Sequence, residues 1–490
     1  MTDRYDACIV GAGISGLNAL FVASQYLSRD QRVILVDRRS RAGGMWMDTY
    51  DYVRLHQPHS LFTAGNIEWT LGKKPDYLAT REEVLEHLHH CLEVIKRRIR
   101  VTELFGYEFE NSEELAGKVR ITCRSSEGRT MELEADRLIK AYGQGIETNP
   151  PLKLSSTRAR SVSPDGFDVR GTEMRASDEP VWIVGAGKTG MDTAHALISD
   201  QPGREVNLIA GPGTLFASRD RFFPGGVRRW RQGKPISLLS MEMARRFDGT
   251  NEADVMSWFG DNYGVRLTPQ TGNFLFAFLS EAENDTIAKG LNEVVMDYFD
   301  DVVDRDGGAE LVLRSGATMP VEPGSWVVNC TGSLMRGEHS YEPYASASGR
   351  VLSIQNRSAT IPFPAGGAAA YFLTHLMFLD KLTQVPLYAM DVEELRRKAP
   401  QYVMAVGLTP LQLYNLSLMA EAIPAGQFRK IVSRNGLDFN RWYPLPRRLR
   451  ASIGFMLTHK REREHYRRTL DKVAERFGVR CGPVVGAGQA

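Results

Sequence analysis

Two stretches of the chain share one pattern of apolar and polar positions. Residues 7–10 form a short apolar run, typical of a strand buried in a parallel sheet, and a glycine turn and an apolar helical pattern follow it. A second strand pattern, residues 32–36, ends at Asp37. Residues 181–197 repeat the strand, turn and helix, and residues 205–209 supply the partner strand. The pattern predicts two βαβ units on parallel sheets.

Each βαβ unit is followed by the same two features. The first is a pair of short strands typical of an antiparallel meander, and the second is an apolar strand that ends at a glycine. In chain order these segments are residues 118–123, 130–134 and 138–143, then 309–314, 318–321 and 326–332. Such a repeat predicts an α/β fold with two Rossmann-like dinucleotide-binding domains and small β-meanders.

The glycines of the first unit have the spacing that binds a dinucleotide. Gly11 permits a tight turn, Gly13 lets a pyrophosphate approach the backbone, and Gly16 lets the helix pack closely on its strand. The phosphates then lie at the N-terminus of the helix. Asp37 stands where an acid accepts hydrogen bonds from a ribose diol.

The second unit has the glycines but lacks the acid. Gly185, Gly187 and Gly190 repeat the spacing, whereas the partner strand ends at an alanine and a glycine. A carboxylate there would repel a 2′-phosphate, so its absence favours NADPH over NADH. Arg219 and Arg221 are the nearest candidates to bind that phosphate, because a planar guanidinium matches phosphate oxygens. The alternative is a solvated loop rich in arginine.

Two dinucleotides in one chain imply electron transfer between them, with one held as a fixed redox group. The first unit is the natural place for FAD and the second for NADPH. We expect an FAD-binding domain over residues 1–168 and 325–384, an NAD(P)H-binding domain over residues 169–324, and a helical C-terminal extension over residues 385–490.

Composition narrows the class of protein. The 490 residues carry 61 basic and 59 acidic side chains, a net charge of +2, which gives no reason to expect nucleic acid. The five cysteines are scattered without a CxxC pair, which suits a reducing compartment and argues against a zinc site or a disulfide-exchange centre. Without a long apolar run or room for a signal peptide, we expect a soluble cytoplasmic protein.

A group of histidines lies on a predicted helix over residues 80–97, which opens with Thr80 and Glu83 in the spacing of a capping box. His87 and His90 share one face of this helix, but no cysteine or carboxylate completes a ligand set. We therefore predict packing or surface histidines and no metal site.

The order of the motifs resembles a known class of flavoprotein. The segments GAGISG, GGMW, AYG, GAGKTGMD and NCTG, with Asp37, are similar to flavin-dependent monooxygenases with two dinucleotide-binding domains, which include flavin-containing, Baeyer–Villiger and N-hydroxylating monooxygenases. The likeness covers residues 5–60, 135–145, 180–200 and 325–335. It implies hydride transfer from NADPH to flavin, capture of molecular oxygen as a C4a-(hydro)peroxide, and insertion of one oxygen atom into a small organic substrate.

The resemblance also assigns cofactor residues by position. It implies that Gly43, Gly44 and Trp46 pack along the FAD near the flavin, and that the turns at Gly143 and Gly332 belong to the two nucleotide sites. The FAD residues are then Gly11, Gly13, Gly16 and Asp37, and the NADPH residues are Gly185, Gly187 and Gly190.

A glycine pair opens an apolar helical pattern over residues 362–382. In similar flavoproteins a helix N-terminus near this point faces the pyrimidine edge of the flavin, where its dipole stabilises the anionic reduced form. Gly366 and Gly367 are the residues to which this role would apply. A plain core helix is the alternative.

Residues 50–59 are the candidate catalytic segment. His56, Gln57 and His59 follow an apolar-aromatic stretch, and a histidine can move protons near neutral pH. Arg54 can pair with a cofactor phosphate or an acidic substrate. His56 stands where Baeyer–Villiger enzymes have an aspartate. The alternative is that these side chains satisfy backbone groups in a buried loop.

The C-terminal region ends in an amphipathic pattern that stops at Gly478. Residues 447–480 hold eleven Lys/Arg against four Asp/Glu, so a membrane-surface helix and a helix packed on the core both fit. The narrow apolar stripe favours the packed helix over peripheral membrane contact. Its members are Tyr466, Leu470, Val473 and Phe477.

Three hypotheses about function remain open. The first is an FAD- and NADPH-dependent monooxygenase that uses molecular oxygen and a small organic substrate. The second is a flavin dehydrogenase that passes electrons from NAD(P)H to a quinone or a protein. The third is a nucleotide-binding protein without turnover, which two intact glycine loops disfavour.

Overall fold

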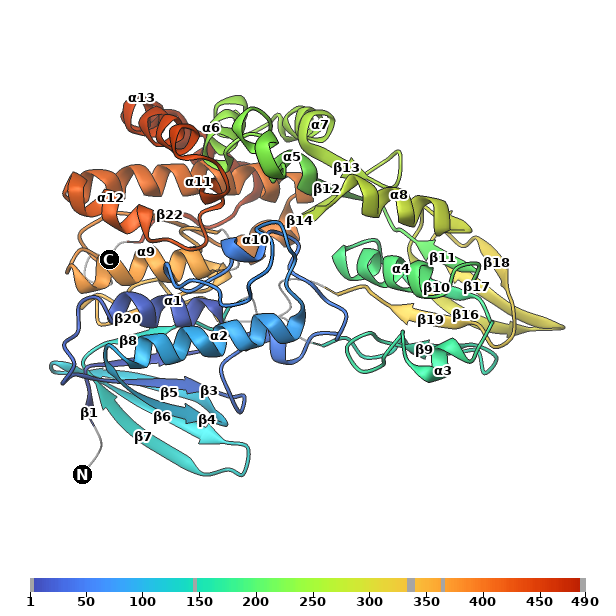
Figure 1. The fold of residues 1–490 in the computed structure, drawn as a ribbon, viewed down its shortest axis with the longest axis horizontal. Helices are drawn as coiled ribbons and strands as arrows, with labels where there is room; N and C mark the ends of the chain where they lie inside the picture. The colour runs from blue at the N-terminus through green and yellow to red at the C-terminus, as the bar shows by residue number, and fades with distance from the viewer. Residues whose placement is uncertain (1–3, 144–147, 333–339, 363–365, 485–490) are drawn as a thin grey trace.

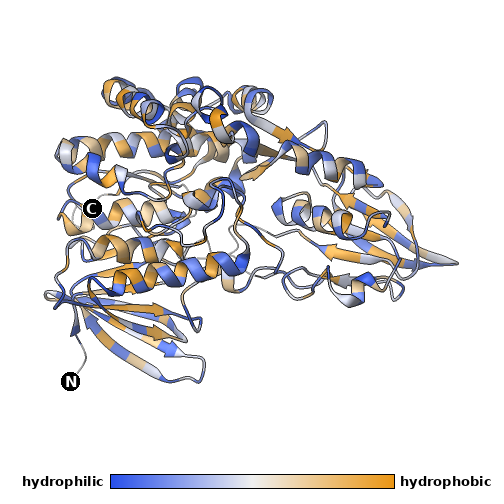
Figure 2. Ribbon diagram, in the orientation of Figure 1, coloured by the Kyte–Doolittle hydropathy of each residue, from blue (hydrophilic) through white to orange (hydrophobic). Residues whose placement is uncertain are grey.

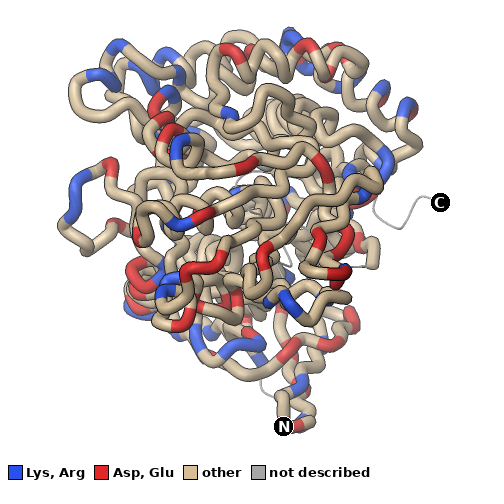
Figure 3. Tube along the Cα trace, turned by 90° about the vertical axis from the view of Figure 1, so that its right-hand side faces the viewer, with Lys and Arg blue, Asp and Glu red and all other residues tan. Residues whose placement is uncertain are grey.

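The computed structural model of the protein describes residues 4–143, 148–332, 340–362 and 366–484. Two α/β units lie side by side, and a layer of helices runs along the upper edge of the molecule (Figure 1). Acidic and basic residues are interspersed along the trace (Figure 3), in keeping with the net charge of +2.

The first unit is built on a five-stranded sheet in which every neighbouring pair is parallel. The inner strands are buried along nearly their whole length, which explains their continuous apolar runs. In spatial order the strands are β20 (Val351–Ser353), β8 (Leu138–Lys140), β2 (Ala7–Val10), β3 (Arg32–Asp37) and β4 (Arg100–Phe105).

Helices cover one face of this sheet and a smaller sheet covers the other (Figure 1). The two predicted meander strands are present, and a third strand extends them. The helices are α1 (Ile14–Ala23), α2 (Arg81–Lys96) and α9 (Gly367–Phe378). The small sheet has the order β1 (Arg4–Tyr5), β7 (Thr130–Ala135), β6 (Lys118–Ser125) and β5 (Tyr107–Leu115).

The second unit repeats this architecture with a parallel sheet, flanking helices and a meander. Its strands are β15 (Glu293–Val295), β11 (Val206–Ile209), β10 (Val181–Val184), β19 (Trp326–Asn329) and β9 (Arg160–Val162). Its helices are α3 (Thr172–Arg175), α4 (Lys188–Asp200) and α8 (Glu281–Gly290), and its meander is β16 (Phe299–Arg305), β17 (Gly308–Leu313) and β18 (Thr318–Val321).

The repeat predicted from the sequence is confirmed by strand pairing. In the first unit β8 pairs with β2, and in the second β19 pairs with β10, each in parallel. The predicted domain boundaries need a correction, because β9 and β19 both belong to the second sheet. Residues 160–162 and 326–329 therefore lie in the second unit, since strand pairing across the chain outweighs their position along it.

A third layer combines an insertion of the second unit with the C-terminal region, and the two share one apolar core. The insertion contains β12 (Thr214–Ser218), α5 (Arg219–Phe222), η3 (Gly226–Trp230), α6 (Ile236–Arg246), α7 (Glu252–Tyr263), β13 (Gly264–Arg266) and β14 (Asn273–Leu279). The C-terminal region contains β21 (Tyr388–Met390), α10 (Val392–Lys398), α11 (Gln401–Ala422), α12 (Ala425–Ser433), η5 (Phe439–Trp442), α13 (Leu445–Phe477) and β22 (Cys481–Pro483).

The C-terminal region is helical, as predicted. Helix α13 ends at Gly478, which has a φ of +57°, and Tyr466, Leu470 and Val473 are buried on the core. Within the described residues, α11 is the one helix long and apolar enough to cross a bilayer, and 72% of its apolar window is buried inside the protein. The cytoplasmic location stays a prediction.

His87 and His375 are buried in the core of the first unit. His87 on α2 stacks on Trp69 with ring centroids 3.8 Å apart, and His375 on α9 lies 2.8 Å from the hydroxyl of Tyr26. Burial lowers the pKa of each histidine to about 3. The packing interpretation of His87 agrees with this environment.

These histidines make stability depend on pH. Below about pH 6.5 the unfolded chain binds protons at His87 and His375 that the folded protein refuses until about pH 3, so the free energy of unfolding decreases as pH falls through that window. Each should contribute a loss of about 2 kcal/mol between pH 8 and pH 5. Urea unfolding at pH 8 and at pH 5 measures this change in the free energy of unfolding. His87→Gln should reduce the pH dependence, while the exposed His89→Gln on the same helix should not.

Candidate functional site

The first glycine loop packs tightly against the end of β8. Gly11 has a φ of +102°, and a Cβ there would lie 2.3 Å from the carbonyl oxygen of Ala141. A Cβ on Gly16 would lie 1.7 Å from the carbonyl oxygen of Gly11. The loop therefore needs glycine at these two positions of the dinucleotide pattern.

The carboxylate of Asp37 closes the other side of this loop. It is 5% exposed and accepts the backbone N–H of Ala12 at 2.6 Å and of Arg39 at 2.8 Å. Each carboxylate oxygen has a further lone pair, so the group can also accept hydroxyl groups of a ribose. The geometry fits the predicted ribose contact, which stays a prediction.

The GGMW segment lies directly on the first glycine loop. Gly43 donates its N–H to the carbonyl oxygen of Ala12 at 3.0 Å, and a Cβ on Gly44 would lie 2.7 Å from the Cα of Gly13. The helical turn that follows buries Trp46. The close approach of the two backbones explains why glycines are needed on both sides.

The carboxyl ends of β8 and β20 face a pocket. Gly143 and Gly366 line it together with Gln355, Ser358 and Thr360. The Oε1 atom of Gln355 and the hydroxyls of Ser358 and Thr360 are buried without a hydrogen-bond partner among the described residues. Such atoms are uncommon in folded proteins and mark a place for the polar groups of a ligand.

Helix α9 begins at this pocket. Gly366 caps it with a φ of +74°, and a Cβ on Gly367 would lie 2.6 Å from a methyl group of Leu437. The first turn of a helix presents free N–H groups and a partial positive charge. The glycine loop, Asp37 and this polar pocket together fit an FAD, whose two ends need phosphate, ribose and flavin contacts.

The second glycine loop repeats the construction on β10 and β19. Gly185 has a φ of +108°, and its Cβ would lie 2.8 Å from the carbonyl oxygen of Cys330. A Cβ on Gly190 would lie 1.9 Å from the carbonyl oxygen of Gly185, and Gly187 caps α4. Gly332 follows the carboxyl end of β19. These features fit a second dinucleotide.

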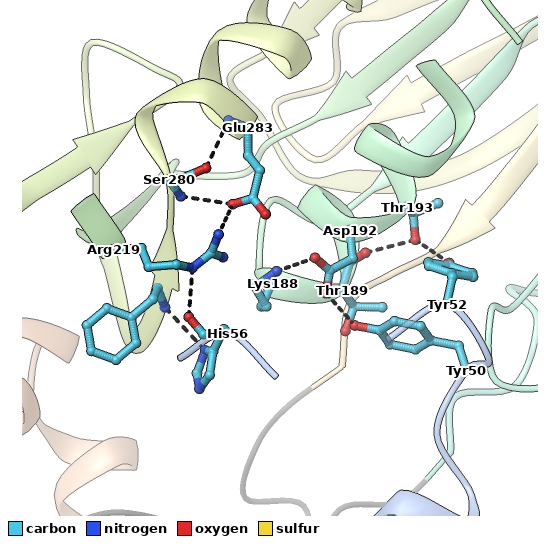
Figure 4. A network of polar contacts seen from close by, with 11 residues as sticks. Tyr50, Tyr52, His56, Lys188, Thr189, Asp192, Thr193, Arg219, Ser280 and Glu283 are labelled. Atoms are coloured by element: carbon cyan, nitrogen blue, oxygen red, sulfur yellow. Dashed lines mark hydrogen bonds and ion pairs between the residues drawn. The ribbon is translucent and has the colours of Figure 1, made fainter. Parts of the chain in front are cut away.

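Two tyrosines join the first unit to helix α4 of the second (Figure 4). Tyr50 donates its hydroxyl to Asp192 at 2.9 Å, and the hydroxyl of Tyr52 lies 2.7 Å from that of Thr193. Burial raises the pKa of both tyrosines well above the usual range, and the charge of Asp192 adds to the rise. Both phenols stay neutral and hold residues 50–59 beside the second glycine loop.

His56 is held from two sides. Its Nδ1 accepts the backbone N–H of Phe278 at 3.2 Å, and its carbonyl oxygen accepts the Nε–H of Arg219 at 2.8 Å. Burial, and then the positive charges of Lys188 and Arg219, lower the pKa of His56 to about 3. The imidazole is therefore neutral at physiological pH and carries its proton on Nε2, because Nδ1 is an acceptor.

Two ion pairs flank His56 (Figure 4). A guanidinium nitrogen of Arg219 lies 2.9 Å from a carboxylate oxygen of Glu283, and Lys188 pairs with Asp192 on the first turn of α4. Burial raises the pKa of Glu283, but the charges of Arg219 and Lys188 outweigh it and lower the pKa to about 2. Each of the two cations beside His56 therefore has an acidic partner, Arg219 with Glu283 and Lys188 with Asp192.

The other predicted catalytic residues have different surroundings. Gln57 is buried, and its Oε1 has no partner in the described part of the chain. The Nδ1 of His59 lies 3.0 Å from the carbonyl oxygen of Tyr77, and the exposed Arg54 donates to the carbonyl oxygen of Leu78 at 3.3 Å. Catalytic roles for these three residues stay predictions.

The two arginines predicted to bind a phosphate have protein partners. Arg219 contacts Glu283 and His56, as described above. Arg221 is 43% exposed, lies 3.3 Å from a carboxylate oxygen of Glu281 and donates to the carbonyl oxygen of Asn262 at 2.8 Å. Their role toward NADPH stays a prediction, and the geometry gives Arg219 a positioning role beside His56.

Sequence reasoning missed part of this cluster. Lys188 and Asp192 are four residues apart on α4, a spacing at which opposite charges meet, and that signal was available in the second glycine motif. Glu283 was recognisable as the third helical residue of a capping box that Ser280 opens. Its pairing with Arg219 could not be predicted from neighbouring residues, because the two side chains come from segments far apart in the chain.

Metal binding has no visible support in the part of the chain that the structure describes. There, no three His, Cys, Asp or Glu side chains are arranged to hold a metal ion. All five cysteines are free thiols, and four of them are buried.

Comparison with known proteins shows the family. Residues 5–260 match the pyridine nucleotide-disulphide oxidoreductase family. Uncharacterized proteins of Mycobacterium tuberculosis and Mycobacterium bovis are 24% identical over 347 residues, which is 67% of this chain. The chain spans about 60% of the length of these curated relatives.

Solved structures show the fold. The closed form of cyclohexanone monooxygenase has a TM-score of 0.52 at 12% identity and covers 88% of this chain and 99% of its own. Cyclohexanone monooxygenase from Rhodococcus sp. Phi1 bound to NADP+ has a TM-score of 0.50 at 12% identity. The match covers 86% of this chain and 98% of that one. A steroid monooxygenase bound to NADP has a TM-score of 0.50 at 14% identity, and the match covers 82% of this chain and 92% of that one. The chain belongs to the pyridine nucleotide-disulphide oxidoreductase family and has the fold of flavoprotein monooxygenases with two dinucleotide-binding domains.

Proposed function

We propose that the protein is an FAD-dependent, NADPH-consuming monooxygenase that inserts one oxygen atom into a small organic substrate. The link between the two units carries the proposal. Residues 50–59 follow the GGMW segment of the first unit and hydrogen-bond through Tyr50 and Tyr52 to α4 of the second. A flavin on the first glycine loop and a nicotinamide on the second are expected to meet at this segment.

The cofactor residues follow from the two loops and the pocket. When bound, FAD accepts a hydride from NADPH and reacts with molecular oxygen. The residues proposed to hold FAD are Gly11, Gly13, Gly16, Asp37, Gly43, Gly44, Trp46, Gly143, Gly366 and Gly367. Those proposed to hold NADPH are Gly185, Gly187, Gly190 and Gly332.

The chain's own side chains prepare the site. The neutral His56 offers an Nε2–H donor that does not change charge across physiological pH. The ion pair of Arg219 with Glu283 fixes the backbone of His56, and Tyr50 and Tyr52 fix the approach of α4. A preorganised donor of this kind stabilises developing negative charge without reorganising.

Oxygenation suits this chain better than disulfide chemistry. A dithiol centre needs two reactive thiols, whereas four of the five free cysteines are buried and the sequence has no CxxC pair. Burial raises the pKa of the Cys330 thiol, the one beside the second glycine loop, to about 12. A thiol with that pKa is a poor nucleophile at neutral pH.

The experiment is anaerobic reduction of the flavin by NADPH, followed by mixing with oxygen. We expect NADPH to reduce the flavin faster than NADH, and isotope-labelled oxygen to appear in a product from a panel of ketones, amines and sulfides. Tyr50→Phe/Tyr52→Phe should slow reduction roughly tenfold through lost alignment. Tyr298→Phe, at an exposed tyrosine of the second unit, is the matched control.

Slow reaction with oxygen and fast reduction of a quinone would overturn the proposal and support the flavin dehydrogenase. An unchanged reduction rate in the double tyrosine variant would remove the observation on which the proposal depends.

A further inference from the structure

The first half of helix α13 carries an exposed apolar stripe that the sequence analysis did not single out. Leu445, Leu449 and Ile453 are 60%, 50% and 56% exposed, and Met456 and Leu457 are 45% and 78% exposed. Leu449 and Ile453 follow at intervals of four, and Met456 and Leu457 lie three and four residues beyond Ile453, so all five share one face of the helix. The packed stripe predicted from the sequence lies further along the same helix.

A second exposed apolar group lies beside the first turn of α13. Val227 and Trp230 on η3 are 83% and 56% exposed. Arg447 ties the two segments together, because its guanidinium donates to the carbonyl oxygens of Arg229 at 3.0 Å and Gly233 at 2.7 Å. The stripe and the two η3 side chains are called the α13–η3 surface below.

This surface is unusual for a monomeric soluble protein. Apolar side chains scattered singly over a surface need no explanation, but seven large ones on two adjoining segments indicate an interaction site. Helix α13 lies along the upper edge of the molecule, where its outer turns alternate between apolar and polar residues (Figure 2). Each of these seven side chains is at least 45% exposed.

Basic residues predominate on the two segments that form the surface, although Lys234, Lys460 and Arg461 pair with Glu242, Glu421 and Glu462. Residues 224–238 and 443–461 contain nine Lys or Arg and no Asp or Glu. Arg228, Arg231 and Arg450 are exposed, and no acidic side chain of the described residues lies within ion-pair distance of them. A binding partner that is apolar at its centre and negative around it complements these unpaired arginines and the apolar stripe.

The charge argues against a second copy of the chain as the partner. A symmetric dimer through this face would bring two arginine-rich segments together, and like charges brought together destabilise a contact. A bilayer with anionic lipids supplies both the apolar interior and the negative rim, and tryptophan favours the boundary between them.

We propose that the α13–η3 surface docks on the anionic face of a lipid bilayer. Helix α13 lies in the plane of the interface, with Leu449, Ile453 and Leu457 below the headgroups and the arginines among the phosphates. The contact is peripheral, since α11, the spanning candidate, is mostly buried in the core. The proposal is independent of the reaction that the protein catalyses.

Flotation of the full chain with vesicles tests the proposal. We expect binding to phosphatidylserine–phosphatidylcholine vesicles, weaker binding at high salt, and little binding to phosphatidylcholine alone. Leu449→Gln/Ile453→Gln/Leu457→Gln should lower the partition coefficient on the order of a hundredfold. Arg228→Gln/Arg231→Gln should lower it roughly fivefold per residue. All five positions are exposed, so circular dichroism and the flavin content should not change.

The matched control replaces exposed apolar side chains elsewhere. Met131 on β7 and Met296 just after β15 are 38% and 42% exposed, and Met131→Gln/Met296→Gln should bind vesicles as the unaltered protein does. Failure of the unaltered protein to float with anionic vesicles overturns the proposal, as does equal binding by the triple variant. A dimer that the triple variant dissociates, seen by sedimentation velocity without vesicle binding, also overturns it and assigns the surface to a second copy.

Discussion

Alanine at Gly16 is expected to give a protein that no longer retains flavin, whereas alanine at Gly190 should keep the flavin and lose NADPH. A Cβ on Gly16 would lie 1.7 Å from the carbonyl oxygen of Gly11, and one on Gly190 would lie 1.9 Å from that of Gly185. Both obstacles are backbone, so relief moves the helix off its strand, at a loss of about 3 kcal/mol in the free energy of unfolding. The same shift displaces the N–H groups that hold the phosphates.

The matched pair tests which loop holds which cofactor. The flavin-to-protein ratio of the folded fraction measures FAD, and anaerobic titration measures NADPH, which Gly190→Ala should bind at least about tenfold more weakly. Gly426→Ala is the control, because nothing lies within 4 Å of the added Cβ. Full flavin in Gly16→Ala, or flavin loss in Gly190→Ala alone, would contradict the assignment.

The parts of the fold that sequence predicted are those with local causes. A four-residue apolar strand, glycines at a fixed spacing and an acid at the end of the next strand all lie in one continuous segment, residues 7–37, which includes Gly11, Gly16 and Asp37. The helix that begins at Thr80 and the one that stops at Gly478 were predictable for the same reason, because capping uses neighbouring residues.

The parts that sequence missed depend on contacts between distant segments. Residues 214–279 and 385–484 pack into one layer, and no sequence pattern in either segment indicates that it contacts the other. The pairing of β9 with β19 moved the domain boundaries for the same reason. Spacing cannot reveal such contacts, since they arise only once both units are folded.

The candidate site shows the same division. Sequence singled out His56 by residue type and position, and the structure adds the two contacts that fix its tautomer and place. Arg219 was chosen as a phosphate ligand because of its chemistry, yet Glu283, 64 residues further along, gives that charge a partner inside the protein. Residue type suggested the chemistry, whereas tertiary contacts decide what each side chain is free to bind.

Removing one partner of the Arg219–Glu283 pair is expected to destabilise the protein at least about twice as much as removing both charges. The two side chains are 13% and 26% exposed, so Arg219→Ala leaves a poorly solvated carboxylate without its counterion. The expected loss in the free energy of unfolding is about 3 kcal/mol. In Arg219→Gln/Glu283→Gln no uncompensated charge remains, and we expect about half of that loss or less. Glutamine at 283 also preserves the capping box with Ser280.

The same variants separate positioning of His56 from simple stability. Arg219 lowers the pKa of His56 and Glu283 raises it, so Arg219→Ala should raise the pKa of His56 above about 3 and Glu283→Gln should lower it further, which NMR titration of the imidazole can follow. Arg219→Ala should also slow flavin reduction by NADPH on the order of tenfold, because the backbone of His56 loses its anchor.

Arg219→Lys should keep the positive charge but lose the paired contacts. A lysine cannot reproduce the guanidinium fork that reaches His56 and Glu283 together. Equal reduction rates in the alanine and lysine variants and the unaltered protein would show that the pair stabilises the fold without positioning the site.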